Sequence, residues 1–286
     1  MSESIQSVVI LGAGVMGQQI AGHCLIHGKD VRIYDVKPPP QLHSRTVEHL
    51  STLTADPVEQ KRRRDLLNAA TVSSNAEEAA CDVDLLIECV PEDIALKRQL
   101  LFQFSKLCPE ETVVTTNTSA YVPSQMVRVV RQPERFAAMH FFPGSTMAEL
   151  MGHANTSDQT IQQLCQFLQE IGHETTICRR ESQGAVFNAM LMPYMGAAVG
   201  IAAKGLASPV EIDHIWKTVT GANEGPFEMM DVVGLDTALA ITKHMLERFD
   251  DPELTMRSEY IQQYVDRGWL GVKSGRGFYR HDDHAS

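Results

Sequence analysis

A histidine and a glutamate stand on either side of a short Pro-Gly turn in the stretch MHFFPGSTMAEL, residues 139–150. His140 ends an apolar run, and Glu149 follows it after the turn. An imidazole titrates near neutral pH and can take up a proton, and a neighbouring carboxylate can fix its tautomer. An isolated pair of this kind is more often a core histidine and a solvated surface charge, so the rest of the chain must supply the context for catalysis.

A glycine motif, GAGVMG at residues 12–17, is the second feature that could do chemistry. It follows the β-branched run SVVILG and precedes a stretch of helical spacing that ends at Gly28. A second strand-like run, DVRIYD, then ends at Asp35. A bare GxGxxG is weak evidence, but strand, glycines, helix, strand and acid in this order predict a dinucleotide-binding unit.

The glycines and the acid have separate roles in such a unit. Gly12 permits the tight turn, Gly14 lets a pyrophosphate approach the backbone, and Gly17 allows close helix packing. The amides at the start of the helix would hold the phosphate charge. Asp35 would accept hydrogen bonds from the adenosine ribose and repel a 2′-phosphate, which predicts NAD rather than NADP. The predicted phosphate loop consists of Gly12, Gly14, Val15, Met16 and Gly17.

Strand-like and helix-like stretches alternate through the first half of the chain, which predicts a doubly wound Rossmann-type α/β sheet. The predicted strands are 7–12, 30–35, 82–90, 112–119, 135–142 and 174–180. The predicted helices cover about 18–28, 42–68, 91–108, 124–130 and 160–172. Because parallel strands end on one edge of a sheet, we expect Ser119 and His140 to face the cofactor there.

From Ser182 onward the sequence contains helical patterns only. We therefore expect residues 1–181 to form the NAD-binding domain and residues 182–286 an all-helical substrate and dimerisation domain. The most apolar part, residues 185–203, is predicted to be a buried helix with Asn188 in its first turns. Helices with this much apolar surface favour a homodimer, although a monomer with internally packed helices is the alternative.

The composition argues against several other classes of protein. A net charge of −11 disfavours nucleic-acid binding, and the basic run at residues 61–64 is expected to be a solvated helix face, with phosphate binding as the alternative. The six cysteines are scattered, so we expect no metal site, no disulfide framework and a reducing compartment, the cytoplasm. We expect neither a membrane span nor a signal peptide.

Seven motifs, in order, carry a resemblance to a known family. They are GAGVMG (12–17), IECVPED (87–93), NTSA (117–120), MHFF (139–142), QGAVFNAMLMPY (183–194), GPFEMMDVVGLD (225–236) and KSGRGFY (273–279). Together they resemble the 3-hydroxyacyl-CoA dehydrogenase family, including its 3-hydroxybutyryl-CoA dehydrogenases, over essentially the whole chain. The resemblance implies NAD-linked interconversion of an L-3-hydroxyacyl thioester and its 3-ketoacyl form, a reaction of fatty acid metabolism.

The resemblance also implies roles for individual residues. His140 matches the family's catalytic histidine, a general base, and Glu149 matches the glutamate that orients it. Ser119 and Asn188 match polar residues that bind the substrate oxygens and the nicotinamide. The residues expected to touch the cofactor in addition are Glu92, Lys97 and Lys273, for which ordinary surface charges are the alternative.

Departures from the family pattern lie at the substrate end. The family usually reads HFFNP, whereas here Phe142 runs straight into Pro143, and Ala189 replaces the usual arginine after Asn188. The second serine of NTSS is Ala120. The loop before the partner glutamate is shorter, so a different alignment would put Met151 in place of Glu149. We infer that NAD chemistry is retained while the acyl group or its carrier differs from short-chain acyl-CoA.

Three functions stay open on this basis. The leading one is a 3-hydroxyacyl thioester dehydrogenase with CoA as the default carrier. A variant keeps the reaction but uses an acyl-carrier-protein thioester or a free 3-hydroxy acid. The third is a non-catalytic NAD-binding protein with a structural or sensory role. The presence of Ser119, His140 and Asn188 together argues against this third function.

Overall fold

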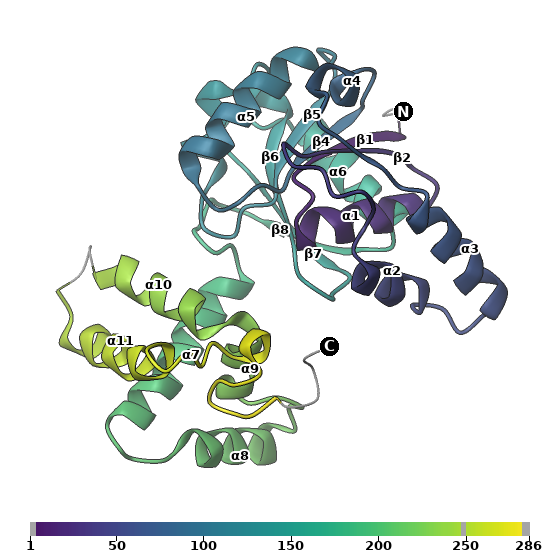
Figure 1. Ribbon diagram of the computed structural model, residues 1–286. Helices are drawn as coiled ribbons and strands as arrows, with labels where there is room; N and C mark the ends of the chain where they lie inside the picture. Colours follow the sequence, from purple (N-terminus) through teal and green to yellow (C-terminus); the bar gives the residue numbers. More distant parts are fainter. Residues whose placement is uncertain (1–3, 247–249, 282–286) are drawn as a thin grey trace. The chain divides into compact units, whose positions relative to one another are not determined.

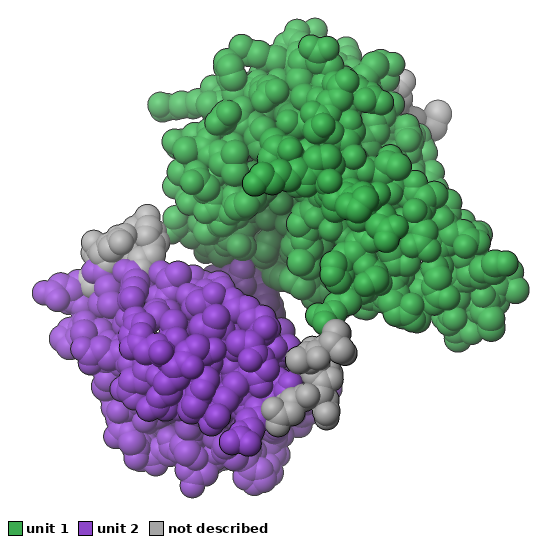
Figure 2. Space-filling view, viewed as in Figure 1, with its two compact units in different colours: residues 1–186 green, residues 187–286 purple. Residues whose placement is uncertain are grey.

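The computed structural model describes residues 4–246 and 250–281 and divides into two compact units, 1–186 and 187–286 (Figure 2). The first unit contains the sheet, and the second contains the helices from Phe187 onward (Figure 1). The predicted boundary after residue 181 lies five residues before this division. The segment between them, residues 182–186, ends directly before the first helix of the second unit.

The sheet of the first unit has the strand order β3-β2-β1-β4-β5-β6-β7-β8. The chain runs outward from β1 to β3 and then returns across β1 to build the other half, as in a doubly wound Rossmann-type sheet, so the predicted fold class is confirmed. Strands β1 to β6 are parallel. The strands are β1 (Ser7–Leu11), β2 (Asp30–Tyr34), β3 (Val72–Ser73), β4 (Leu85–Glu88), β5 (Val113–Thr116), β6 (Phe136–Phe141), β7 (Met147–Gly152) and β8 (Glu174–Cys178).

Helices cover both faces of this sheet because successive strand residues point to opposite sides (Figure 1). Val8 and Ile10 of β1 belong to the core beneath α1, α2, α3 and α6, whereas Val9 and Leu11 belong to the core beneath α4 and α5. The six α-helices described in this unit are α1 (Val15–Ile26), α2 (Ser44–Ser51), α3 (Pro57–Asn68), α4 (Ala76–Ala80), α5 (Ile94–Leu107) and α6 (Asp158–Glu170).

One strand was not predicted, and it changes the far end of the sheet. After the turn in which Ser145 N–H donates to the Phe142 carbonyl, β7 runs antiparallel to β6. Strand β8 then pairs parallel to β7, so it runs opposite to the strands that carry the glycine loop and His140. Residues 147–152 have no strong strand pattern, and burial of Ala148 and Leu150 against the core fixes them as a strand.

Two predicted helices have a different form. Residues 42–68 make two helices, because Pro57 lacks the amide that a continuous helix needs and Asp56 caps a new start by accepting from Val58 N–H at 3.0 Å. Residues 124–130 form 3-10 turns rather than an α-helix, since Pro123 and three nearby β-branched valines disfavour longer helical growth. The 3-10 segments are η1 (Pro123–Gln125), η2 (Val127–Val129) and η3 (Pro133–Arg135).

The described part of the second unit is helical, as predicted. Its elements are α7 (Phe187–Ala203), α8 (Pro209–Thr220), α9 (Pro226–Val233), α10 (Leu235–Leu246), α11 (Pro252–Val265) and the 3-10 turn η4 (Val272–Ser274). The predicted buried helix is correct only for the second half of α7, where Met195 and Val199 join the core, whereas Met190 near its start is exposed. Among the described residues, no helix combines the length and apolar character needed to cross a membrane.

Candidate active site

The glycine loop joins β1 to α1 in a geometry that side chains would prevent. Gly12 has a φ of +103°, and a Cβ atom there would lie 2.8 Å from the Cys89 carbonyl oxygen. A Cβ atom at Gly17 would lie 1.9 Å from the Gly12 carbonyl oxygen, so the helix can start this close to the strand only with glycine. At Gly14 a Cβ atom would have no neighbour within 4 Å. The exposed face of Gly14 leaves the space that a pyrophosphate needs.

Asp35 lies against the same loop, one residue beyond the end of β2. Its Oδ2 accepts a hydrogen bond from Ala13 N–H at 2.8 Å, and its Oδ1 accepts one from Lys37 N–H at 2.8 Å. A carboxylate offers about four lone-pair sites, so two remain for ligand hydroxyls. A negatively charged acceptor beside an open glycine turn and a helix N-terminus fits the ribose and pyrophosphate of NAD.

His140 and Glu149 are direct neighbours on adjacent strands. They face each other in the antiparallel register of β6 and β7, and His140 Nδ1 lies 3.4 Å from Glu149 Oε2. Met151 lies opposite Ala138 instead, so the alternative alignment does not bring Met151 to the histidine. Glu149 Oε1 accepts a second hydrogen bond from Val186 N–H at 2.9 Å.

The surroundings of His140 keep its ring neutral near pH 7. Burial lowers the pKa of His140 below its ordinary value of 6.5, and the carboxylates of Glu149 and Glu92 oppose this effect without reversing it. With Nδ1 directed at Glu149, the proton of the neutral ring belongs on Nδ1 and Nε2 is the basic nitrogen. A neutral imidazole with an anchored Nδ1 is the form that a general base requires.

The end of β6 is held in place by a residue that was not predicted to take part. Asn117, just after β5, accepts a hydrogen bond through Oδ1 from Phe141 N–H at 2.8 Å. The ring of Phe142 packs against His140 with centroids 4.5 Å apart. Asn117 belongs to the same NTSA motif as Ser119. Its position two residues before a predicted site residue was the signal in the sequence that could have marked Asn117 as part of the site.

The loop after β5 carries Ser119, which is exposed. Glu92 binds both neighbours of Ser119, because its Oε1 accepts from Thr118 Oγ1 and from Ala120 N–H. Lys97 in turn pairs with Glu92 Oε2 at 3.2 Å. Lys97 is only 1% exposed, so the alternative of an ordinary surface charge is wrong for this residue.

Two predicted residues belong to the second unit. Asn188 is the second residue of α7 and is partly exposed. Lys273 lies in η4 and forms an ion pair with Asp236, with Nζ 2.5 Å from Oδ1. The roles predicted for Asn188 and Lys273 stay predictions.

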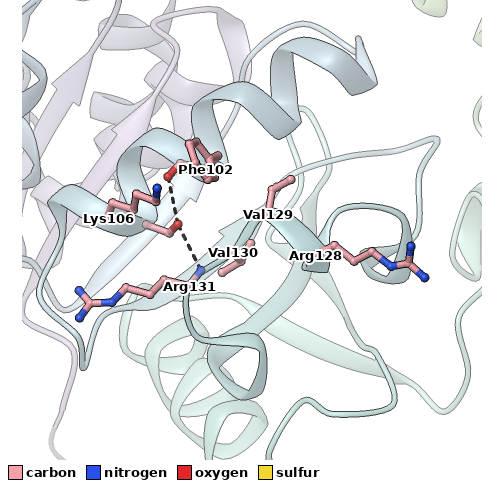
Figure 3. A pocket seen from close by; sticks show the side chains of 7 residues that line it. Phe102, Lys106, Arg128, Val129, Val130 and Arg131 are labelled. Carbon is pink, nitrogen blue, oxygen red and sulfur yellow. Dashed lines mark hydrogen bonds between the residues drawn. The ribbon is translucent and has the colours of Figure 1, made fainter.

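A cavity of about 330 Å³ lies in the first unit, between the C-terminal half of α5 and the segment around η2. It is lined by Phe102, Ser105, Lys106, Arg128, Val129, Val130 and Arg131. Figure 3 shows the guanidinium groups of Arg128 and Arg131 directed away from each other, so the cationic groups do not converge on one ligand. The cavity lies toward the edge of the sheet at which β6 begins, whereas His140 lies near the end of β6.

The basic run at residues 61–64 lies on α3 and is engaged in ion pairs. Arg62 and Arg63 both bind Glu59, and Arg64 binds Glu48. These pairs support the interpretation as a solvated helix face. Within the described ranges, no group of three or more His, Cys, Asp or Glu side chains could hold a metal ion.

The fold and the site define a dehydrogenase of the Rossmann type with an NAD-binding domain, and comparison with known proteins gives the family. Residues 7–182 match the NAD binding domain of 3-hydroxyacyl-CoA dehydrogenase, and residues 184–281 match its C-terminal domain. The chain therefore belongs to the 3-hydroxyacyl-CoA dehydrogenase family, an enzyme family of NAD-dependent oxidoreductases.

Individual relatives resemble the chain over almost its full length. A probable 3-hydroxyacyl-CoA dehydrogenase of Caenorhabditis elegans is 31% identical, covering 98% of this chain and 97% of the relative. The structure of (S)-3-hydroxybutyryl-CoA dehydrogenase from Ralstonia eutropha has a TM-score of 0.81 at 29% identity, covering 97% of this chain and 99% of that one. A diketoreductase structure has a TM-score of 0.83 at 31% identity with the same coverage of 97% and 99%.

Proposed function

We propose that this enzyme interconverts an L-3-hydroxyacyl thioester and its 3-ketoacyl form, with acyl-CoA as the default substrate. NAD, when bound, accepts the hydride that leaves C3 of the substrate. The proton of the C3 hydroxyl goes to His140 Nε2, and the same nitrogen returns it in the reverse reduction. The observation that carries the proposal is the buried His140 opposite Glu149, at the carboxyl end of β6 in a sheet whose glycine loop fits NAD.

Glu149 would orient and stabilise the histidine. The 3.4 Å distance from Nδ1 to Oε2 is long for a hydrogen bond, and the contact would tighten when the ring gains a proton and positive charge. The bond from Val186 N–H holds the other oxygen of the carboxylate, so Glu149 stays directed toward the ring. These two contacts favour Glu149 over Met151 as the partner residue.

The remaining residues would bind substrate and cofactor. Ser119 and Asn188 would donate hydrogen bonds to the substrate oxygen where charge develops in the transition state. The proposed cofactor residues are Gly12, Gly14, Val15, Met16, Gly17, Asp35, Glu92 and Lys273. Lys97, predicted from the resemblance to touch the cofactor, is bound to Glu92 and would act on the cofactor through that contact.

The acyl carrier is the open part of the proposal. Pro143 directly after Phe142, Ala120 and Ala189 all alter the substrate end, whereas the glycine loop and Asp35 keep the family pattern. An acyl-carrier-protein thioester or a free 3-hydroxy acid is therefore the second candidate. The similar diketoreductase structure, described for catalysis on dicarbonyl compounds, is compatible with both candidates, because 3-ketoacyl thioesters and 3-keto acids each carry two carbonyl groups.

The deciding experiment follows NADH absorbance with purified enzyme and a panel of 3-hydroxyacyl-CoAs, acyl-carrier-protein thioesters and free 3-hydroxy acids. We expect the highest kcat/KM for a thioester, and the carrier follows from which part of the panel is turned over. His140→Gln serves as the matched inactive protein. Turnover of no compound by a protein that still binds NAD would contradict the proposal and favour a non-catalytic NAD-binding protein.

We also propose that the enzyme works as a homodimer in the cytoplasm. On α8, Val210, Ile215 and Val219 are all more than half exposed, and exposed apolar side chains grouped on one helix are typical of subunit interfaces. The six free cysteines fit a reducing compartment. Sedimentation analysis at micromolar concentration tests the dimer, and a monomer mass would contradict it.

A further inference from the structure

A buried ionic network lies where β4 and β5 end. Glu88, the last residue of β4, accepts hydrogen bonds from Lys97 Nζ at 2.8 and 3.1 Å, from Thr116 Oγ1 at 2.5 Å and from Val90 N–H at 2.8 Å. Glu88 is 0% exposed and Lys97 is 1% exposed. Because two charges have been removed from water, such a pair persists only when its hydrogen bonds are satisfied. The bonds around Glu88 meet that condition.

The ammonium of Lys97 is fully occupied by protein oxygens. It has three N–H donors, and besides Glu88 it contacts the Val90 carbonyl at 3.2 Å and Glu92 Oε2 at 3.2 Å. Burial by itself lowers the pKa of Lys97, but the carboxylates of Glu88 and Glu92 outweigh burial and raise it, so the ammonium stays charged. Lys97 thus has no donor to spare for a bound ligand while these contacts persist.

Glu92 connects this network to the predicted site. Its side chain is 34% exposed, in contrast to Lys97 and Glu88 behind it. While Oε2 faces Lys97, Oε1 accepts from Thr118 Oγ1 and from Ala120 N–H, the residues on either side of Ser119. A single carboxylate therefore fixes the backbone of the loop that carries Ser119.

We propose that Lys97 is a positioning residue that, together with Glu88, holds Glu92 and through Glu92 holds the Ser119 loop. Lys97 then contributes to cofactor and substrate binding indirectly, through the geometry of this edge of the sheet. The inference rests on the proposed function, because the position of Ser119 affects turnover only if the substrate reacts beside this loop.

The network also has an electrostatic consequence for His140. Two carboxylates raise the pKa of His140 against burial, Glu149 from β7 and Glu92 from the segment after β4. Glu92→Gln should therefore lower the pKa of His140 and move the acid limb of the pH profile to lower pH, because the base must be neutral to act.

The test uses a double variant, Glu88→Gln with Lys97→Met, in the full-length chain. Replacing both partners leaves no buried charge unpaired, which preserves folding better than Lys97→Met alone. Lys106→Met on the same helix is the matched control, since Lys106 is exposed and its ammonium stacks over the Phe102 ring. Circular dichroism establishes that both variants are folded.

Turnover across the pH range gives the first readout. We expect kcat of the double variant to fall about 10- to 100-fold, as displacement of a substrate-positioning group does. Its acid limb should stay where it is in the control, because one positive and one negative charge are removed together, whereas Glu92→Gln should move the acid limb to lower pH. A double variant with the kcat of Lys106→Met would overturn the proposal.

Hydrogen exchange gives a readout that needs no turnover. The Ala120 amide is bonded to Glu92, so peptides covering residues 117–121 should exchange faster in the double variant than in the control. Unchanged exchange there would overturn the positioning role even if the wild-type enzyme is active. An inactive wild-type enzyme with faster loop exchange in the variant would instead mean that the proposed function fails while the network holds the loop.

Discussion

The glycine loop and the His140 site lie at the same edge of the sheet but are built by different means. The loop, from Gly12 to Gly17, is one continuous segment whose shape depends on the absence of side chains. The His140 site depends on side chains from separate segments: His140 from β6, Glu149 from β7 and Glu92 from the segment after β4. A backbone site can be encoded locally, whereas a side-chain site depends on strand pairing and register.

The largest effect is expected at the His140 site. His140→Gln removes the group that takes the substrate proton, so we expect kcat to fall by about 10⁴-fold. The glycine loop is untouched, so NAD affinity measured by fluorescence titration should stay at the wild-type value. Turnover close to wild type would remove His140 from its proposed role.

Glu149→Gln should cost less, because the base itself remains. We expect kcat to fall by about 10²- to 10³-fold, since the imidazole loses its orientation and the stabilisation of its charged form. Loss of this carboxylate lowers the pKa of His140 further, so the acid limb of the pH profile should move to lower pH. A limb that stays in place or moves upward would show that Glu149 does not act on the titrating group.

Two glycine variants separate folding from ligand binding in the loop. Gly17→Ala puts a Cβ atom 1.9 Å from a backbone oxygen, and we expect a loss of about 1–3 kcal/mol of stability together with weaker NAD binding. Gly14→Ala meets no neighbour within 4 Å, so its melting temperature should match wild type while NAD binding weakens. Normal NAD affinity in Gly14→Ala would mean that no ligand approaches the loop there.

Asp35→Ala should have the smallest effect, mainly on cofactor preference, although the Ala13 amide of the glycine loop also loses its acceptor. Hydrogen bonds to a charged group contribute about 1.5–3 kcal/mol each, so loss of the ribose contact should reduce the preference for NAD over NADP by about 10- to 100-fold. The ratio of kcat/KM for the two cofactors measures it. An unchanged ratio would refute the ribose contact. His140→Gln should leave the relative affinity for NAD and NADP unchanged.

The sequence predicted the elements that have strong local signals. The runs ending at Gly12 and Asp35 are strands, and the stretch after the glycines is a helix, because β-branched residues, glycines and helical spacing act over a few residues. Strand β7 was missed because residues 147–152 alternate weakly, and its pairing with β6 depends on contacts formed only after folding. The α2–α3 break was missed although Pro57 marked it.

The candidate site divides in the same way. The identity of His140 and Glu149 could be taken from the sequence by resemblance, but two alignments competed, and only the register of β6 with β7 put Glu149 rather than Met151 opposite the histidine. The role of Asn117 in holding Phe141 was also not predicted, because an amide bonding to the next strand leaves no periodic pattern.

Local signals in the sequence predicted the Rossmann-type class, NAD as the cofactor and the candidate residues, because glycine spacing, hydropathy and residue chemistry are local properties. The folded chain was needed to show that Lys97 is buried behind Glu92, that Glu149 faces His140, and that burial outweighs two carboxylates in setting the pKa of His140. Those facts depend on distances between segments far apart in the chain, and such distances are set when the strands pair and the core closes.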